Sequence, residues 1–354
     1  MKELWSAHCR ELTPYVPGEQ PRGRKFIKLN TNENPYPPSR MVLQAIQEAA
    51  ADLRLYPEPS ALAVREAVAQ DQGIKPEQVF VGNGSDEVLS LAFAAFFDPD
   101  RPIRFADITY SFYPVFASFY GLRYEEIPLD ENFTIPLKPF LEPCGGVVIA
   151  NPNAPTGREM EFCDLRAIVE ADPGRVVIVD EAYVDFGARS AVELIGRCPN
   201  LLVVRTFSKS CSLAGLRVGY AMGNEDLIAA LNTVKDSFNS YPVDRLAQAG
   251  AVGAIRDKEY FRATISKINA TRSFASNELR KMGFTVCDST ANFLFVSHEK
   301  VSGKVLLDGL RDRGILVRWW DRPRIRDYLR ITIGTDEDMK TLCKAMAEIL
   351  AERE

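Results

Sequence analysis

Lys209 follows a strongly apolar stretch of the chain, and a lysine in such a place can act as a nucleophile. The stretch at 201–204 reads Leu-Leu-Val-Val, and Arg-Thr-Phe-Ser separates it from the lysine. Burial and a nearby cation, such as Arg217, both disfavour the ammonium form and lower the pKa of a lysine. The neutral amine can then form a Schiff base with an aldehyde. Without further evidence, Lys209 could equally be an ordinary solvated lysine in a loop.

Two further apolar stretches are also followed by polar residues that could do chemistry. The Val-Val-Ile-Val stretch at 176–179 runs into Asp180, with Tyr183 three residues later, and the Val-Val-Ile-Ala stretch at 147–150 leads to Asn153. In open parallel sheets a ligand binds beyond the carboxyl ends of the strands. We therefore expect Asp180, Asn153 and Lys209 to converge at one edge of a sheet.

A glycine-rich turn at 82–87 precedes an apolar pattern typical of a helix, and it contains Gly84, Ser85 and Asp86. A turn that opens a helix can bind an anion, because its free backbone N–H groups and the helix dipole face the ligand. An ordinary Ser or Asp helix cap would give the same pattern. The sequence therefore offers a candidate phosphate site here.

In this order, the motifs N-P-N-x-P-T-G, D-E-A-Y and S-K-x-x-x-L-A-G-L-R-x-G resemble the fold-type I aminotransferases that use pyridoxal 5'-phosphate. The resemblance implies that Lys209 binds the cofactor covalently and later moves the substrate proton. It implies that Asp180 pairs with the cofactor's ring nitrogen, which must stay protonated to withdraw electrons. Asn153 and Tyr183 would donate to its phenolate oxygen.

The same resemblance implies a cradle for the cofactor phosphate and an aromatic residue that stacks on its ring. The implied phosphate and cofactor contacts are Gly84, Ser85, Asp86, Thr206, Ser208 and Arg217. Tyr110 matches the stacking residue. Its neighbours Phe112, Tyr113 and Phe116 are expected to lie in the core.

Segments 12–18, 29–36, 54–59 and 328–334 extend the resemblance over the whole chain, to the histidinol-phosphate aminotransferase family. This resemblance implies a homodimer with shared active sites, in which Tyr56 reaches the cofactor of the partner subunit. It also implies that Tyr15, Arg318 and Arg330 bind the substrate. An arginine fork suits a phosphate, but it would suit a carboxylate equally well.

Composition excludes several other functions. The chain has 354 residues, a net charge of -5, seven cysteines and two histidines. The acidic balance argues against nucleic-acid binding, and no apolar run is long enough for a membrane span. The cysteines lack C-x-x-C pairs or histidines at metal-ligand spacing, so we expect free thiols, no metal and a cytoplasmic location. Two histidines also make a Ser-His-Asp hydrolase improbable.

The expected fold class is α/β, with a mostly parallel central sheet wrapped by helices and a smaller α+β C-terminal domain. The chain exceeds the roughly 250 to 300 residues at which single cores stop growing. We expect a large cofactor-binding domain at 36–245, and a small domain made of 1–35 plus 246–354. Helical patterns cover 41–51, 61–72, 87–97, 161–171, 226–255 with an interruption at 241–242, 258–282 and 336–352. Strands are expected at 79–81, 292–296, 315–317 and 329–333, besides the three at the site.

Three activities remain open at this point. The first is transamination between L-histidinol phosphate and 2-oxoglutarate, giving imidazole-acetol phosphate and glutamate in histidine biosynthesis. The second is an aromatic-amino-acid aminotransferase or a threonine-phosphate decarboxylase of the same fold. The third is a cofactor-binding domain without turnover, which the presence of Lys209, Asp180, Tyr183, Asn153 and Arg217 disfavours.

Overall fold

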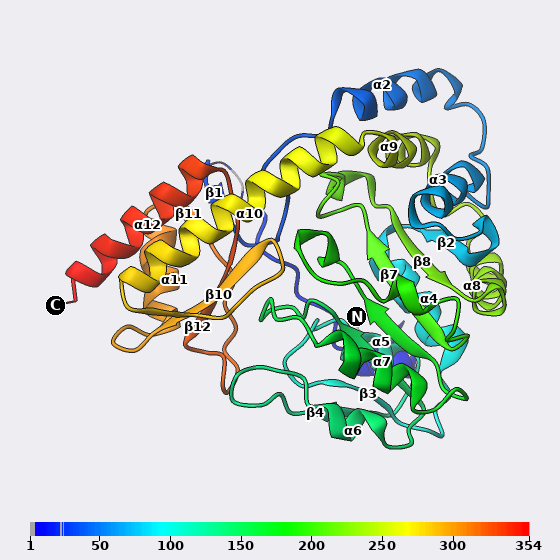
Figure 1. Ribbon diagram of the computed structural model, residues 1–354, viewed down its shortest axis with the longest axis horizontal. Helices are drawn as coiled ribbons and strands as arrows, with labels where there is room; N and C mark the ends of the chain where they lie inside the picture. The colour runs from blue at the N-terminus through cyan, green and yellow to red at the C-terminus, as the bar shows by residue number, and fades with distance from the viewer. Residues whose placement is uncertain (1–3, 22, 24, 354) are drawn as a thin grey trace.

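The computed structural model describes residues 4–21, 23 and 25–353. Its centre is a seven-stranded sheet in the order β2-β8-β7-β6-β5-β3-β4 (Figure 1). Neighbouring strands are parallel, except that β8 is antiparallel to both β2 and β7. The strands are β2 (Val79–Gly82), β3 (Ile103–Ala106), β4 (Tyr124–Ile127), β5 (Gly146–Ala150), β6 (Val177–Asp180), β7 (Leu201–Thr206) and β8 (Gly219–Gly223). The predicted α/β class with a mostly parallel sheet is confirmed.

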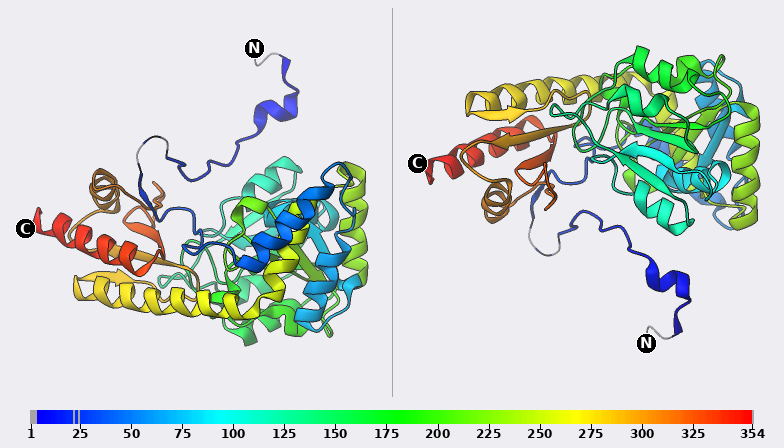
Figure 2. Two further views of the ribbon diagram at one scale, coloured as in Figure 1. Left: turned by 90° about the horizontal axis from the view of Figure 1, so that it is seen from above. Right: turned by 90° about the horizontal axis from the view of Figure 1, so that it is seen from below.

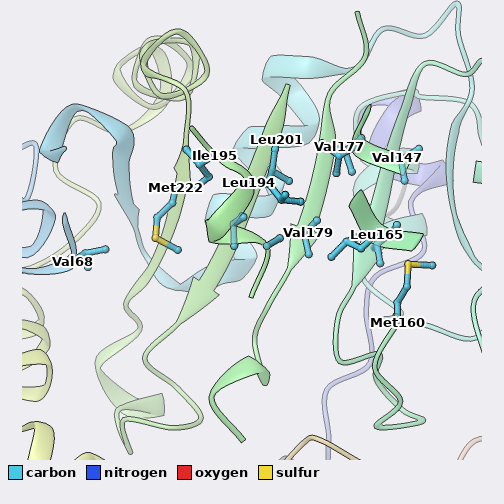
Figure 3. Close-up of a cluster of buried hydrophobic side chains, with 14 of the residues drawn as sticks. Val68, Val147, Met160, Leu165, Val177, Val179, Leu194, Ile195, Leu201 and Met222 are labelled. Carbon is cyan, nitrogen blue, oxygen red and sulfur yellow. The ribbon is translucent and has the colours of Figure 1, made fainter. Parts of the chain in front are cut away.

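The three central strands β5, β6 and β7 are buried along their whole length. Parallel strands that are covered on both faces read as continuous apolar runs, and these runs were the signal in the sequence. Figure 3 shows the packing on one face, where side chains of β5, β6 and β7 meet Leu165, Leu194 and Met222. The strands are thus held rigidly, and so are the residues that follow their carboxyl ends.

Helices cover both faces of this sheet (Figure 1). They are α2 (Arg40–Ala49), α3 (Leu62–Gln72), α4 (Gly84–Phe96), α5 (Tyr113–Phe119), α6 (Leu137–Leu141), α7 (Phe162–Glu170), α8 (Glu225–Phe238) and α9 (Arg245–Arg256). Several begin with a side chain that accepts from a first-turn N–H, namely Ser39, Asn224 and Asp244. Such caps satisfy N–H groups that the helix itself leaves unpaired.

A second body contains β9 (Phe284–Val286), β10 (Phe293–His298) and β12 (Tyr328–Thr332), which form an antiparallel sheet in the order β12-β10-β9. Helices α10 (Lys258–Lys281), α11 (Gly303–Asp312) and α12 (Asp336–Ala351) pack on it. The N-terminal segment joins this body, since β1 (Ile27–Lys28) pairs in parallel with β11 (Ile315–Leu316). The predicted domain limits at 35/36 and 245/246 stay a prediction.

The described residues before β1 are mostly exposed, and apart from α1 most of them have no regular secondary structure. In Figure 2 this segment leaves the small body as a blue coil that carries α1 (Ala7–Glu11) on the outside of the molecule. The ring of His8 in α1 lies 5.8 Å from that of Phe119, and Tyr15 stacks on Phe112 at 4.5 Å. These aromatic contacts attach the segment to the large body beside α5.

The remaining predicted elements agree in type, with small changes of bounds. The pattern at 226–255 is two helices, α8 and α9, because Tyr241-Pro242 lies in the link between them. The C-terminal strand is β12, and the expected helix at 258–282 is α10. Short 3-10 helices complete the chain at Ala50–Asp52, Pro76–Gln78, Val184–Phe186, Ala191–Leu194 and Ala214–Leu216. None of the helices in the described part combines the length and apolarity that crossing a bilayer requires.

Candidate active site

A cavity of about 500 Å³ lies beyond the carboxyl ends of β5, β6 and β7. The large body contributes Ala150, Asp180 and Lys209 from these strand ends, and the small body contributes Arg330. Strand register explains the convergence, because Ala150 pairs with Asp180 and Asp180 pairs with Val204. Other lining residues are Tyr15, Asn30, Thr31, Asn32, Glu33, Ser85, Asp86, Tyr110, Phe112, Ala182, Tyr183, Thr206, Ser208, Arg217 and Arg318.

Asp180 is a buried carboxylate, with 5% of its surface exposed. Tyr113 donates its hydroxyl to Asp180 Oδ2 at 2.8 Å, and the backbone N–H of Ala182 donates to Oδ1 at 3.2 Å. Burial raises the pKa of Asp180 to about 6, although these two hydrogen bonds oppose the rise. Among the described residues Asp180 has no ion pair, so a cationic ligand group beside it would keep it ionised.

Lys209 extends from the loop after β7, and its ammonium group contacts backbone rather than a carboxylate. Lys209 Nζ donates to the carbonyl of Thr31 at 3.0 Å. Burial, together with a smaller effect from the positive charge of Arg330, lowers the pKa of Lys209 to about 8. A substantial fraction of the neutral amine therefore exists near neutral pH, as a nucleophile requires.

The first turn of α4 forms an anion cradle. Its N-cap, Asn83, makes no side-chain cap hydrogen bond, so the first N–H groups remain available to a ligand. A Cβ on Gly84 would lie 2.4 Å from Arg217 Nη2, and a Cβ on Gly219 would lie 2.2 Å from the backbone nitrogen of Ser85. Two glycines thus let the helix start, β8 and Arg217 approach each other closely.

Asp86 holds two of the predicted cofactor contacts in place. Asp86 Oδ1 accepts from the Tyr110 hydroxyl at 2.7 Å, and Oδ2 accepts from Arg217 Nη2 at 3.2 Å. Arg217 also donates to Ser208 Oγ at 3.4 Å. The aromatic ring of Tyr110 and the guanidinium of Arg217 are therefore fixed relative to the α4 cradle.

Two arginines from the small body form a second cationic region in the cavity. Arg318 and Arg330 pair through their backbones, and both guanidinium groups lie over Trp320, at 5.4 and 5.3 Å from its ring centre. Arg330 Nη2 donates to the carbonyl of Asn30 at 3.0 Å, while Arg330 Nε is buried without a partner. A buried unpaired donor of this kind is a group that an anionic ligand would satisfy.

The donor set fits the predicted cofactor, pyridoxal 5'-phosphate. The α4 cradle with Arg217 suits a phosphate, and the buried Asp180 suits a protonated ring nitrogen. Lys209 offers the amine that an aldehyde needs. The cavity volume of about 500 Å³ lies in the range usual for cofactor and small-molecule sites.

Comparison with known proteins identifies the family. The model for "Aminotransferase class I and II" matches residues 24–346. The chain belongs to the class I and II aminotransferase family. Histidinol-phosphate aminotransferases are among its relatives: that of Acinetobacter baumannii is 52% identical over 98% of this chain and 97% of the relative, and that of Aromatoleum aromaticum is 53% identical over 99% and 100%.

Solved structures of other aminotransferases have the same fold as this chain. Histidinol-phosphate aminotransferase from Sinorhizobium meliloti, in complex with pyridoxal-5'-phosphate, has a TM-score of 0.90 at 25% identity, covering 99% of this chain and 98% of the other. A putative aminotransferase from Burkholderia pseudomallei has a TM-score of 0.79 at 30% identity, covering 92% and 99%. The predicted fold-type I class is confirmed.

Most of the predicted site residues of this aminotransferase line the cavity, and three do not: Gly84, Asn153 and Tyr56. Gly84 lies in the first turn of α4, close to Arg217. Asn153 Nδ2 donates to the Ile108 carbonyl at 2.9 Å and to Thr156 Oγ1 at 3.2 Å. Tyr56 is 80% exposed and stacks on Tyr241 at 4.9 Å. The roles predicted for Asn153, Tyr56 and all the other site residues remain predictions.

The sequence analysis missed several residues of this site. Tyr113 is buried in the core as predicted, but its hydroxyl also contacts Asp180. Phe112, expected in the core, lines the cavity and stacks on Tyr15. The segment at 30–33 contributes four lining residues. In the sequence it served only as part of the family resemblance at 29–36, and no site role was predicted for it.

Proposed function

We propose that this aminotransferase transfers the amino group between L-histidinol phosphate and 2-oxoglutarate, as a step of histidine biosynthesis. The observation that carries the proposal is the pair Arg318 and Arg330, which adds a second anion-binding region to a cavity that already has a cradle at α4. With the cofactor phosphate in the α4 cradle, the arginine pair is left to bind a second phosphate, which the substrate supplies. Relatives that are 52% and 53% identical and are named histidinol-phosphate aminotransferases support the same choice.

The cofactor of the proposal is pyridoxal 5'-phosphate. When bound, it supplies an electron sink that stabilises negative charge at the substrate α-carbon. Ser85, Ser208, Arg217 and the first N–H groups of α4 bind the phosphate. The name of the S. meliloti structure, which includes this cofactor, supports the assignment.

The remaining proposed roles follow from the contacts of each side chain. The Asp180 carboxylate holds a proton at the ring nitrogen, and Tyr113 orients that carboxylate. Lys209 Nζ, with its lowered pKa, accepts the proton from the substrate α-carbon as a general base. Tyr183 donates its hydroxyl proton to the phenolate oxygen, and Tyr110 packs against the ring.

We further propose that the enzyme is a cytoplasmic homodimer with shared active sites, built from the large and small domains predicted above. Large apolar side chains are exposed around the N-terminal half of the large body, which is unusual for the surface of a monomer. They are Met41, Leu43, Leu53, Leu55, Tyr56, Leu62, Phe238 and Tyr241. All seven cysteines are free thiols, as in proteins of a reducing compartment.

A half-reaction screen tests the substrate. The cofactor-loaded enzyme is mixed with single amino donors, and conversion to the pyridoxamine form is followed by absorbance. We expect L-histidinol phosphate to react with a kcat/KM at least tenfold above that of histidinol, histidine or phenylalanine. Equal rates with phenylalanine would favour an aromatic-amino-acid aminotransferase, and release of carbon dioxide from threonine phosphate would favour the decarboxylase.

The arginine pair makes the test sharper. Arg330→Ala removes charge-assisted hydrogen bonds from a desolvated region, which costs about 2 to 5 kcal/mol when the partner is a charged group. We expect kcat/KM to fall steeply for histidinol phosphate and little for histidinol, because histidinol has no phosphate for Arg330 to bind. Equal losses for both donors would mean that Arg330 does not bind the substrate phosphate.

A further inference from the structure

A small network around Asn32 determines which way a hydrogen bond runs at the edge of the cavity. Asn32 is 1% exposed and has a φ of +57°. Its backbone N–H donates to Thr332 Oγ1 at 2.9 Å, and Thr332 Oγ1 lies 3.0 Å from Asn32 Oδ1. The amide carbonyl only accepts, so the single hydroxyl proton of Thr332 is donated to it. If the Asn32 amide were flipped, Oδ1 would no longer accept from the Thr332 hydroxyl. Thr332 is only 2% exposed, so this hydroxyl would lose its acceptor in a buried place.

The other end of the Asn32 amide faces Tyr183. With Oδ1 held by Thr332, Asn32 Nδ2 donates to Tyr183 Oη at 2.9 Å. The Tyr183 oxygen therefore accepts from Asn32, and its own proton remains to be donated elsewhere. Tyr183 lines the cavity, so the free direction of its hydroxyl includes the space where a ligand binds.

The network also connects the two bodies of the molecule. Asn32 follows β1, Thr332 ends β12, and Tyr183 belongs to the loop after β6. Asn292 Nδ2 donates to the Asn32 carbonyl at 3.0 Å, which fixes the backbone of this residue as well. The donor direction at Tyr183 is thus determined by residues of the small body.

We propose that Asn32 and Thr332 are positioning residues that direct the Tyr183 hydroxyl proton into the cavity, toward the cofactor. The inference rests on the proposed function, in which Tyr183 donates to the phenolate oxygen of pyridoxal 5'-phosphate. It adds that the donation depends on two residues that act only through Tyr183.

Asn32→Gly is the direct test, because glycine tolerates the positive φ and keeps both backbone contacts, to Thr332 and to Asn292. The readout is the pH midpoint of the cofactor absorbance in the substrate-free, cofactor-loaded enzyme. A hydrogen bond to the phenolate oxygen withdraws electron density from the cofactor. It thereby makes the Lys209 nitrogen that is joined to the cofactor less basic. Weakening this bond raises the midpoint, and we expect a rise of about one pH unit.

A double-mutant cycle with Tyr183→Phe shows whether Asn32 acts through the tyrosine. In the Tyr183→Phe background, Asn32→Gly should shift the midpoint by less than about 0.2 pH unit, because Asn32 then has no Tyr183 hydroxyl to act through. A shift as large as in the parent enzyme would overturn the proposal, and so would an unchanged midpoint in Asn32→Gly alone.

A second readout does not need the cofactor. In the cofactor-free enzyme, burial raises the pKa of Tyr183, and the hydrogen bond from Asn32 opposes the rise. NMR titration of ring-labelled tyrosine should therefore give a higher pKa for Tyr183 in Asn32→Gly and in Thr332→Val than in the parent enzyme. Thr332→Ser, which keeps the hydroxyl, is the matched control and should titrate like the parent.

The two readouts separate two kinds of failure. A parent enzyme that shows no absorbance of bound cofactor would contradict the proposed function, while the NMR titration would still measure the Asn32 hydrogen bond. An unchanged Tyr183 titration in Asn32→Gly would overturn the inference about Asn32 and leave the proposed function intact.

Discussion

At the scale of single residues, Lys209 should react with an aldehyde at a lower pH than an ordinary lysine does. The neutral amine is the reactive form, and burial lowers the pKa of Lys209 to about 8 from the usual 10.5. We expect the rate of covalent pyridoxal phosphate attachment to the cofactor-free enzyme to rise with pH and to reach half its plateau near pH 8. Borohydride reduction should then place the label on Lys209, and label on another lysine would contradict the assignment.

Arg330 contributes to this reactivity, because its positive charge also disfavours the ammonium form of Lys209. Arg330→Leu should therefore move the half-maximal pH upward by a fraction of a unit. Arg326→Leu is the control, since Arg326 is exposed and lies near Asp321 rather than in the cavity. Equal profiles for the parent enzyme and Arg330→Leu would remove the electrostatic role of Arg330.

Tyr113 should keep Asp180 ionised. Its hydrogen bond lowers the pKa of a carboxylate that burial raises to about 6. Tyr113→Phe removes this bond, so the carboxylate form is reached only at higher pH. We expect the acid limb of the kcat/KM profile to move upward by about one pH unit or less. Tyr120→Phe, which removes a hydroxyl that contacts Ser90 instead, should leave the limb in place.

The sequence predicts some of these residues and not others, for a physical reason. Lys209 and Asp180 follow continuous apolar runs, and such runs are visible in one dimension. Tyr113 and Asn32 gain their importance from hydrogen bonds across 67 and 151 positions of the chain. No local pattern encodes the direction of such a bond, so Tyr113 reads only as a core aromatic.

At the scale of elements, the start of α4 depends on Gly219 in β8. A Cβ there would lie 2.2 Å from the Ser85 nitrogen and 2.4 Å from the Gly84 carbonyl carbon, which are backbone atoms that cannot rotate away. Gly219→Ala should displace the first turn of α4. We expect cofactor affinity to fall at least about tenfold, and overpacking to cost about 1 to 3 kcal/mol of stability.

Gly215→Ala is the matched control, because a Cβ at Gly215 meets nothing within 4 Å. It should change neither the dissociation constant for pyridoxal phosphate, measured by fluorescence titration, nor the melting temperature. Parent-like affinity in Gly219→Ala would mean that the α4 cradle does not bind the cofactor phosphate.

Elements were predictable where burial is uniform. β5, β6 and β7 are buried throughout and were recognised, whereas β4 is an edge strand with three exposed residues out of four and was not. β8 begins and ends with glycine, which weakens any strand signal. β11 was expected at 315–317, but β1 was not, because two residues are too few to show a period. Their pairing joins positions almost 290 apart in the chain, which no local pattern indicates.

At the scale of the whole molecule, the exposure of Tyr56 bears on how the active site is completed. Tyr56 is 80% exposed, does not line the cavity of its own chain, and stands among the exposed apolar residues of the proposed dimer interface. Arg245 donates to its backbone carbonyl at 2.8 Å, so the loop is held while the ring stays accessible. We therefore expect the Tyr56 ring to contact a partner subunit in the proposed dimer.

Mixing two inactive variants tests the shared site. Lys209→Ala lacks the amine, and Tyr56→Ala lacks the contact that each subunit is proposed to give to its partner. In a mixed dimer one site combines an intact Lys209 with the partner's intact Tyr56, so we expect up to about a quarter of parental activity to return when subunits assort at random into symmetric dimers. Each variant must first be shown to be inactive alone, and subunit exchange must be followed by an independent label. If exchange is complete and activity does not return, each site is built from one chain, and Tyr56 has no part in it.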